Sequence, residues 1–76
     1  MEDYEIQAFD AAIRAINGWS YKDGIQPLHE AATVAFAIVE AQRDFERRHK
    51  LHTGYRELGD MVVHALGDVS ERHPLS

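Results

Sequence analysis

The sequence predicts an all-α protein: a short N-terminal helix followed by a long antiparallel helical hairpin, three helices in total. Apolar residues recur every three or four positions in three segments, and short glycine-containing breaks divide these segments. The 76 residues are expected to form one helical domain, residues 1–76. A domain this small has a modest core, which usually contributes only about 3–5 kcal/mol of stability.

The first helix is predicted from about residue 3 to residue 16, where isoleucine and phenylalanine recur at spacings of three and four. Asn17-Gly18 is expected to end it, because glycine suits the left-handed conformation that often follows a last helical turn. Trp19 is then expected to fold back on Ile13. Two alternatives stay open for Trp19, inward packing or partner contact.

The second helix is predicted from Pro27 to about His52, after a loop over residues 18–26 with a turn at Asp23-Gly24. Proline fits the first turn of a helix, where its missing N–H group has no helical partner. The half of this helix that follows residue 40 is mostly charged, with Phe45 and Leu51 as apolar anchors, and should be largely exposed.

The segment TVAFAIV, residues 33–39, is apolar on every face of the second helix and is expected to be buried all round. One neighbouring helix cannot cover such a segment. The chain also has no cysteine, so disulfides cannot supplement a small core. These features predict a homo-oligomer, most simply a dimer, although a compact three-helix monomer is the alternative. The predicted interface consists of Val34, Ala35, Phe36, Ile38 and Val39.

The third helix is predicted from Tyr55 to about Glu71, after a break at Thr53-Gly54 and before Pro74. Its apolar stripe consists of Tyr55, Leu58, Met61, Val62, Ala65, Leu66 and Val69. Because the break is short, the second and third helices should form the antiparallel hairpin.

The net charge of −5 arises from 13 acidic and 8 basic residues and argues against a general nucleic-acid-binding protein. No apolar run approaches the roughly 20 residues of a membrane span, and the acidic N-terminus lacks the pattern of a signal peptide. We therefore expect a cytoplasmic protein without a membrane partner.

Two surfaces are candidates for binding a partner protein. One is an aromatic segment after the first helix, here called the elbow (residues 19–22), and the other is the hairpin tip (residues 47–56), which lies in a region rich in basic residues. Aromatic and arginine side chains are enriched where proteins bind each other. The candidate partner-binding residues are Trp19, Tyr21, Lys22, Arg47, Arg48, Lys50 and Tyr55.

The stretch ELGD, residues 57–60, followed by the apolar MVVHAL, resembles the second carboxylate motif of the all-α nucleoside triphosphate pyrophosphohydrolases of the MazG kind. That family carries E-x-x-E on one helix and E-x-x-D on a partner helix. The resemblance implies that Glu57 and Asp60 would hold Mg²⁺ against substrate phosphates. The first half of the motif is missing, because Glu30-Ala31-Ala32-Thr33 has only the leading glutamate.

A tight turn near residue 53 offers another role for the same two carboxylates. It would place Glu57 opposite Lys50 and Asp60 opposite Arg47, which predicts ion pairs across the hairpin. This alternative needs no metal.

Five histidines are present, and Glu46, His49 and His52 follow each other at spacings of three, as in half of a di-iron ligand set. Asp60 and His64 could add ligands in an oligomer. We expect instead a solvated helix end without metal, with His29 and His73 exposed.

The sequence therefore favours a small non-enzymatic helical protein that docks on a larger protein and modulates it, as an inhibitor, adaptor or antitoxin-like regulator does. No cofactor and no catalytic residue is predicted. The first alternative is a metal-dependent nucleoside triphosphate pyrophosphohydrolase, and the second is a protein that sequesters a nucleotide between Tyr21, Lys22 and the basic tip of a neighbouring subunit.

Overall fold

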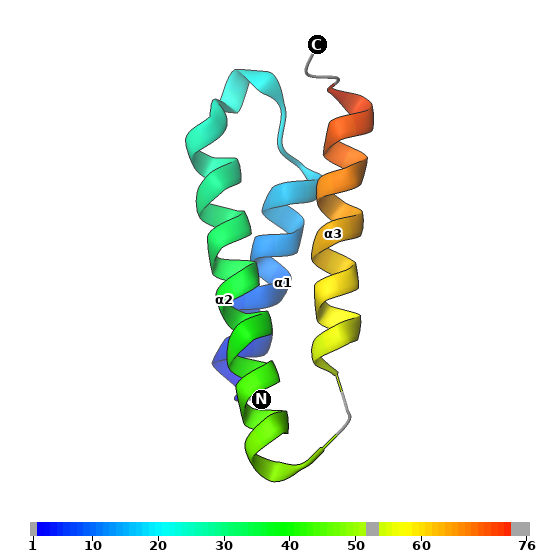
Figure 1. Ribbon diagram of the computed structural model, residues 1–76. Coiled ribbons are helices and arrows are strands. Elements are labelled where there is room, and N and C mark those ends of the chain that lie inside the picture. Colours follow the sequence, from blue (N-terminus) through cyan, green and yellow to red (C-terminus); the bar gives the residue numbers. More distant parts are fainter. Residues whose placement is uncertain (1, 52–53, 74–76) are drawn as a thin grey trace.

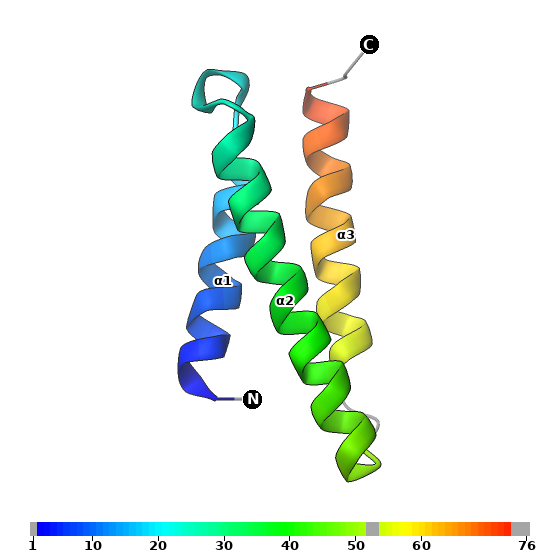
Figure 2. The ribbon, with the colours of Figure 1, turned by 60° about the vertical axis from the view of Figure 1, so that its left-hand side comes forward.

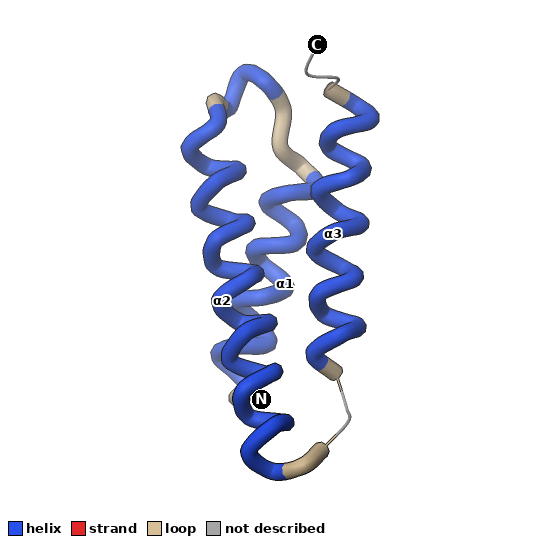
Figure 3. Tube along the Cα trace, viewed as in Figure 1, coloured by secondary structure: helices blue, strands red, loops and turns tan. Residues whose placement is uncertain are grey.

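The chain is helical, as predicted, in a computed structural model that describes residues 2–51 and 54–73 (Figures 1 and 3). No strand occurs within those two ranges. The elements in chain order are α1 (Asp3–Asn17), the short 3₁₀ helix η1 (Tyr21–Asp23), α2 (Ile25–His49) and α3 (Tyr55–Arg72).

The molecule is slender, with extents of 42 × 22 × 14 Å. In Figure 1 the chain rises through α1, descends through the long α2 and rises again through α3. The shorter α1 lies behind the other two helices in that view and to one side in Figure 2, so α2 and α3 share one face that α1 does not cover. The elbow and the tip consequently lie at opposite ends of the long axis.

The core is one cluster to which all three α-helices contribute. Four of its ten buried apolar side chains are alanines, which lets the helices approach closely but buries little apolar surface. The cluster consists of Phe9, Ala12, Ile16, Trp19, Ala31, Ala35, Ile38, Val62, Ala65 and Val69.

Trp19 packs inward, as one of the two sequence-based alternatives predicted. Its side chain is 7% exposed, and its indole Nε1 donates a hydrogen bond to the Gly24 carbonyl at 2.6 Å. The prediction for Gly18 is wrong: its φ of −93° is not left-handed, and the helix ends with its N–H bonded to the Arg14 carbonyl. The turn at Asp23-Gly24 is present, and Gly24 takes a φ of +79° that suits glycine.

Helix α2 begins at Ile25, two residues earlier than predicted, which still leaves Pro27 in its first turn. It ends at His49, before the predicted His52, which lies outside the described residues. The reversal occurs at Lys50, whose φ of 54° is left-handed.

Two hydrogen bonds close the last turn of α2. The Lys50 N–H reaches the Arg47 carbonyl at 3.4 Å, and the Leu51 N–H reaches the Glu46 carbonyl at 2.9 Å. This is the Schellman arrangement, in which glycine usually takes the left-handed position that lysine takes here.

The expectation that residues 33–39 are buried on every face is wrong for the single chain. Ala35 and Ile38 are buried in the core, whereas Val34 and Phe36 are 43% and 41% exposed. The reason is geometric: α1 and α3 cover one strip of α2, and the strip from Ala31 to Glu46 accounts for the buried side chains of that helix.

We expect Lys50→Gly to stabilise the protein. A left-handed conformation costs an L-residue about 1–2 kcal/mol, and glycine's extra freedom in the unfolded chain offsets part of this gain. The expected rise in the free energy of unfolding is about 0.5–1 kcal/mol, measured by urea denaturation followed by circular dichroism.

Lys50→Ala is the matched control, because it removes the same side chain but keeps the strained conformation. If both variants were equally stable, a left-handed residue 50 would not be the source of the effect.

Candidate functional site

Glu46 is the only fully buried charged side chain in the described part of the chain, with 1% of its surface exposed. It lies in the last turn of α2, yet its carboxylate contacts the first residues of α3. Oε1 accepts a short hydrogen bond from the Gly54 N–H, and Oε2 accepts one from the Tyr55 N–H at 3.3 Å. Glu46 therefore caps α3 from another helix.

This cap is favourable for two reasons. The first N–H groups of a helix have no partner within the helix, and the positive end of the helix dipole attracts a carboxylate. Since the Glu46 carbonyl also accepts the Leu51 N–H, one residue both ends α2 and starts α3. This double contact joins the end of α2 to the start of α3 on either side of residues 52–53.

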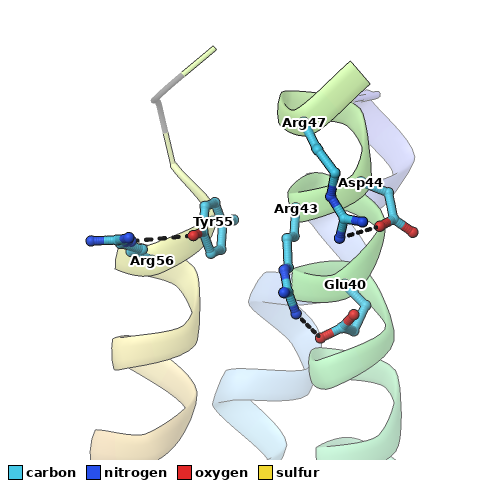
Figure 4. A network of polar contacts seen from close by, with 6 residues as sticks. All are labelled: Glu40, Arg43, Asp44, Arg47, Tyr55 and Arg56. Carbon is cyan, nitrogen blue, oxygen red and sulfur yellow. Dashed lines mark hydrogen bonds and ion pairs between the residues drawn. The ribbon is translucent and has the colours of Figure 1, made fainter. Parts of the chain in front are cut away.

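The cations of the tip contact their own helices. Arg47 pairs with Asp44 at 3.3 Å, and Arg48 Nε donates to the Asp44 carbonyl at 3.4 Å. A shallow hollow is lined by Asp44, Arg47 and Arg48. One turn earlier, Arg43 pairs with Glu40 at 3.7 Å. Figure 4 shows Arg43 and Arg47 on the side of α2 that faces Tyr55.

The predicted ion pairs across the hairpin are wrong. Between the two described segments, no ion pair joins Lys50 to Glu57 or Arg47 to Asp60. The physical reason is that Arg47 meets Asp44 three residues earlier on its own helix, a spacing that brings side chains together without any contribution from α3.

Tyr55 and Arg56 form the α3 side of the tip (Figure 4). The Arg56 guanidinium carbon lies 5.8 Å from the centre of the Tyr55 ring, and Arg56 Nε donates to the Tyr55 hydroxyl at 3.2 Å. This hydrogen bond raises the pKa of the Arg56 guanidinium, so the group stays positive. Arg56 points away from α2 and is fully exposed.

Apolar side chains accompany these cations. Phe45 and Leu51 are 39% and 43% exposed, and the Phe45 ring lies against His49 with ring centres 4.3 Å apart. A second shallow hollow joins this part of α2 to the start of α1. It is lined by Glu2, Glu5, Ala41, Gln42, Phe45 and Arg48. The tip thus combines exposed cations with exposed aromatic and aliphatic groups.

The carboxylates of the proposed metal motif lie apart from other ligands. Glu57 and Asp60 are exposed on α3. Across residues 2–51 and 54–73, no three His, Cys, Asp or Glu side chains come close enough together to hold a metal ion. Within the described residues, therefore, no third protein ligand lies beside these two carboxylates.

The histidines also take separate positions. The Glu46 carboxylate accepts a hydrogen bond from α3, and the His49 ring lies against Phe45. His64 Nε2 lies 3.7 Å from a carboxylate oxygen of Asp68. His52 lies outside the described residues. His29 is exposed, as predicted.

The elbow carries an aromatic cluster that includes a distant histidine. Trp19, Tyr21 and His73 meet edge to face, with ring centres 4.5–5.6 Å apart. The prediction that His73 is exposed is therefore wrong, because α3 returns its C-terminal end to the elbow. Arg72 Nη1 donates to the Asn17 carbonyl at 2.7 Å and anchors the same end. Only Tyr21 and Lys22 of the elbow set remain exposed, since Trp19 is a core residue.

The residues predicted for the oligomer interface point in different directions. Ala35 and Ile38 are enclosed by the chain itself, and Val39 is half-buried beside α3. Val34 and Phe36 are exposed but are two residues apart on α2, so they lie on opposite flanks of the helix.

Comparisons with protein-family models, with curated proteins and with solved structures gave no match. The function is therefore argued from the residues of the chain itself. Within the described helices, none combines the length and apolar character needed to cross a membrane.

We expect Glu46→Ala to destabilise the protein by about 2–3 kcal/mol, because the N–H groups of Gly54 and Tyr55 lose a charged acceptor in a buried position. Glu46→Gln should cost about 1 kcal/mol, since the amide oxygen can still accept one bond. Urea denaturation at one protein concentration measures both.

The exposed Glu40, whose ion pair with Arg43 is long, provides the control. Glu40→Ala should change stability by less than about 0.5 kcal/mol. Equal losses for Glu46→Ala and Glu40→Ala would contradict the role assigned to the buried carboxylate.

Proposed function

We propose that this chain is a small non-enzymatic binding protein whose tip docks on an acidic surface of a larger protein and modulates that protein. The supporting observation is the composition of the tip. In the described part of the chain, Arg48, Lys50 and Arg56 have no carboxylate partner. Arg48 lines a hollow with the exposed Phe45, Lys50 adjoins the exposed Leu51, and Arg56 lies against the Tyr55 ring. Arginine next to aromatic and other apolar side chains is typical of the centre of a protein–protein interface.

Charge distribution supports the tip over the elbow. Residues 40–60 contain five basic and five acidic residues, whereas the rest of the chain contains three basic and eight acidic ones and so accounts for the whole net charge of −5. One of the five acids, Glu46, is buried in the cap. An acidic partner would therefore be attracted to the tip and repelled by the rest of the surface, which orients the encounter.

The proposed binding unit is a homo-oligomeric bundle of these hairpins, most simply a cytoplasmic dimer. A compact monomer of 8.7 kDa exposes about 4,700 Å² by the scaling of surface with mass. This chain exposes 5570 Å². The excess of roughly 850 Å² is close to the ~800 Å² that each partner buries in an interface of standard size.

A capture experiment with matched variants tests the docking surface. The wild-type chain, a tip variant (Arg48→Glu with Lys50→Glu) and an elbow variant (Tyr21→Ala with Lys22→Glu) are immobilised and exposed to an extract of the native host. We expect a stoichiometric partner with an acidic surface that the wild-type and elbow variants retain and the tip variant loses. Binding should weaken as salt is raised.

Two results would overturn the proposal. A partner that binds the tip variant but not the elbow variant would assign docking to Tyr21 and Lys22. The absence of any specific partner would remove the binding function altogether.

The pyrophosphohydrolase alternative has its own test. The chain is incubated with each of the four nucleoside triphosphates and Mg²⁺ or Mn²⁺, and pyrophosphate release is measured. We expect no release, because Glu57 and Asp60 have no further carboxylate near them in the described structure. Release that Glu57→Ala abolishes and Glu40→Ala leaves intact would establish the enzyme instead.

A further inference from the structure

We infer that a second copy of this chain packs on the face shared by α2 and α3, antiparallel to the first copy. We call it the α2–α3 face and define it by Phe36, Val39, Gly59, Val63 and Gly67. The inference rests on the proposed homo-oligomer and adds the location and direction of its interface, which differ from those predicted from the sequence.

The close approach of α2 and α3 locates this face. A methyl group added at Gly59 would lie 3.7 Å from Val39 Cγ1, so the two helices are nearly in contact there. Phe36 is one turn before Val39, and Val63 is one turn after Gly59. Because α3 runs back along α2 (Figure 1), Phe36 and Val63 both lie about one turn from the Val39–Gly59 approach in the same direction, and so at similar levels.

Both side chains remain open to solvent, although both are apolar. Phe36 is 41% exposed and Val63 is 63% exposed. Helix α1 does not cover them, because it lies on the other side of α2 and α3 in both ribbon views (Figures 1 and 2). Residues 32–39 of α2 contain no charged side chain, so this part of the face is not a typical solvated surface.

The shape of the face suits a copy of itself. Gly59 and Gly67 lie one turn before and one turn after Val63. Because glycine has no side chain, the surface of α3 is low on both sides of Val63. Phe36 is the bulky group at a similar level. A two-fold axis that runs across the helices brings α3 of one copy against α3 of the other and α2 against α2. The glycines then let the two α3 helices approach closely on either side of Val63, and the contact is isologous.

Charge selects the orientation. Arg43 and Arg47 border the tip end of the face, where each is paired with a carboxylate of α2 (Figure 4). The remaining cations of the tip end, Arg48, Lys50 and Arg56, outnumber its remaining exposed acids, Glu57 and Asp60. The opposite end of the molecule carries four acidic residues (Asp23, Glu30, Asp68 and Glu71) and two basic ones (Lys22 and Arg72), so its net charge is negative. In an antiparallel pair, the net positive end of each copy lies beside the net negative end of the other, whereas a pair with its tips together brings like charges into proximity. The two tips of the dimer then point in opposite directions.

Light scattering and sedimentation equilibrium of three proteins test the face. The wild-type chain should have twice the 8.7 kDa mass of one chain at tens of micromolar. Val63→Glu should raise the dissociation constant by about 100-fold or more, because a charge would be buried at the centre of the interface. Val34→Glu, a control on the other flank of α2, should remain dimeric. Circular dichroism checks that each variant is folded.

The possible results separate this inference from the proposed function. A monomeric wild-type chain would overturn both the inference and the homo-oligomer, while docking by the tip would remain testable by capture. A dimeric Val63→Glu, or a monomeric Val34→Glu, would keep the oligomer and overturn the face assigned here.

Cysteine cross-linking tests the orientation in a chain that has no cysteine of its own. Arg56 and Ser70 lie seven residues before and after Val63, on the same side of α3. Arg56→Cys and Ser70→Cys chains are mixed and oxidised, and the products are identified by mass spectrometry. The antiparallel pair should give chiefly the mixed disulfide between an Arg56→Cys chain and a Ser70→Cys chain. Preferential disulfides between two Arg56→Cys chains would overturn the antiparallel orientation in favour of a pair with its tips together. Random pairing would overturn the ordered interface.

Discussion

The buried carboxylate of Glu46 is the interaction on which the rest of the structure depends. Its main-chain carbonyl closes α2 and its side chain opens α3, so one residue sets where one helix ends and the next begins. A helix start that is capped from a neighbouring helix has its position and direction fixed relative to that neighbour. The face shared by α2 and α3 is a consequence of this constraint.

The same constraint decides which chemistry the tip can present. Glu46 is directed inward, so it is not available as a surface carboxylate or as a metal ligand. Around it, Arg47 and Arg48 contact Asp44 on their own helix, and Lys50 is exposed where the chain reverses. The surface at this end therefore displays cations beside apolar groups on a protein that is acidic elsewhere, and this contrast supports a binding role.

A second constraint comes from the size of the core. Alanine fills four of the ten buried apolar positions in the described helices, and the molecule is only 14 Å thick in its smallest dimension. Close helix contacts of this kind bury little apolar area per residue, so large side chains such as Phe36 and Val63 remain outside. The exposed area of the single chain, 5570 Å², reflects this thin core, and it is the area on which the proposed assembly is argued.

Features that depend on neighbouring residues could be read from the sequence. The three helical segments, the turn at Gly24 and the place of Pro27 all follow from side-chain periodicity and turn chemistry within a few residues. A left-handed residue was predicted at Gly18, after the first helix, where none occurs. The left-handed Lys50 was not predicted, because the reversal after α2 is set by hydrogen bonds to the Glu46 and Arg47 carbonyls. Residue type alone does not report such bonds.

The sequence by itself determined that the chain is helical, where its apolar stripes lie and how its charge is distributed. Only the tertiary structure decided that Glu46 is a cap, that Ala35 faces inward while Phe36 faces outward, and that His73 joins Trp19. The physical reason is distance along the chain. The donors to Glu46 lie eight and nine residues away, and which strip of an all-apolar helix is buried depends on where the other helices pack.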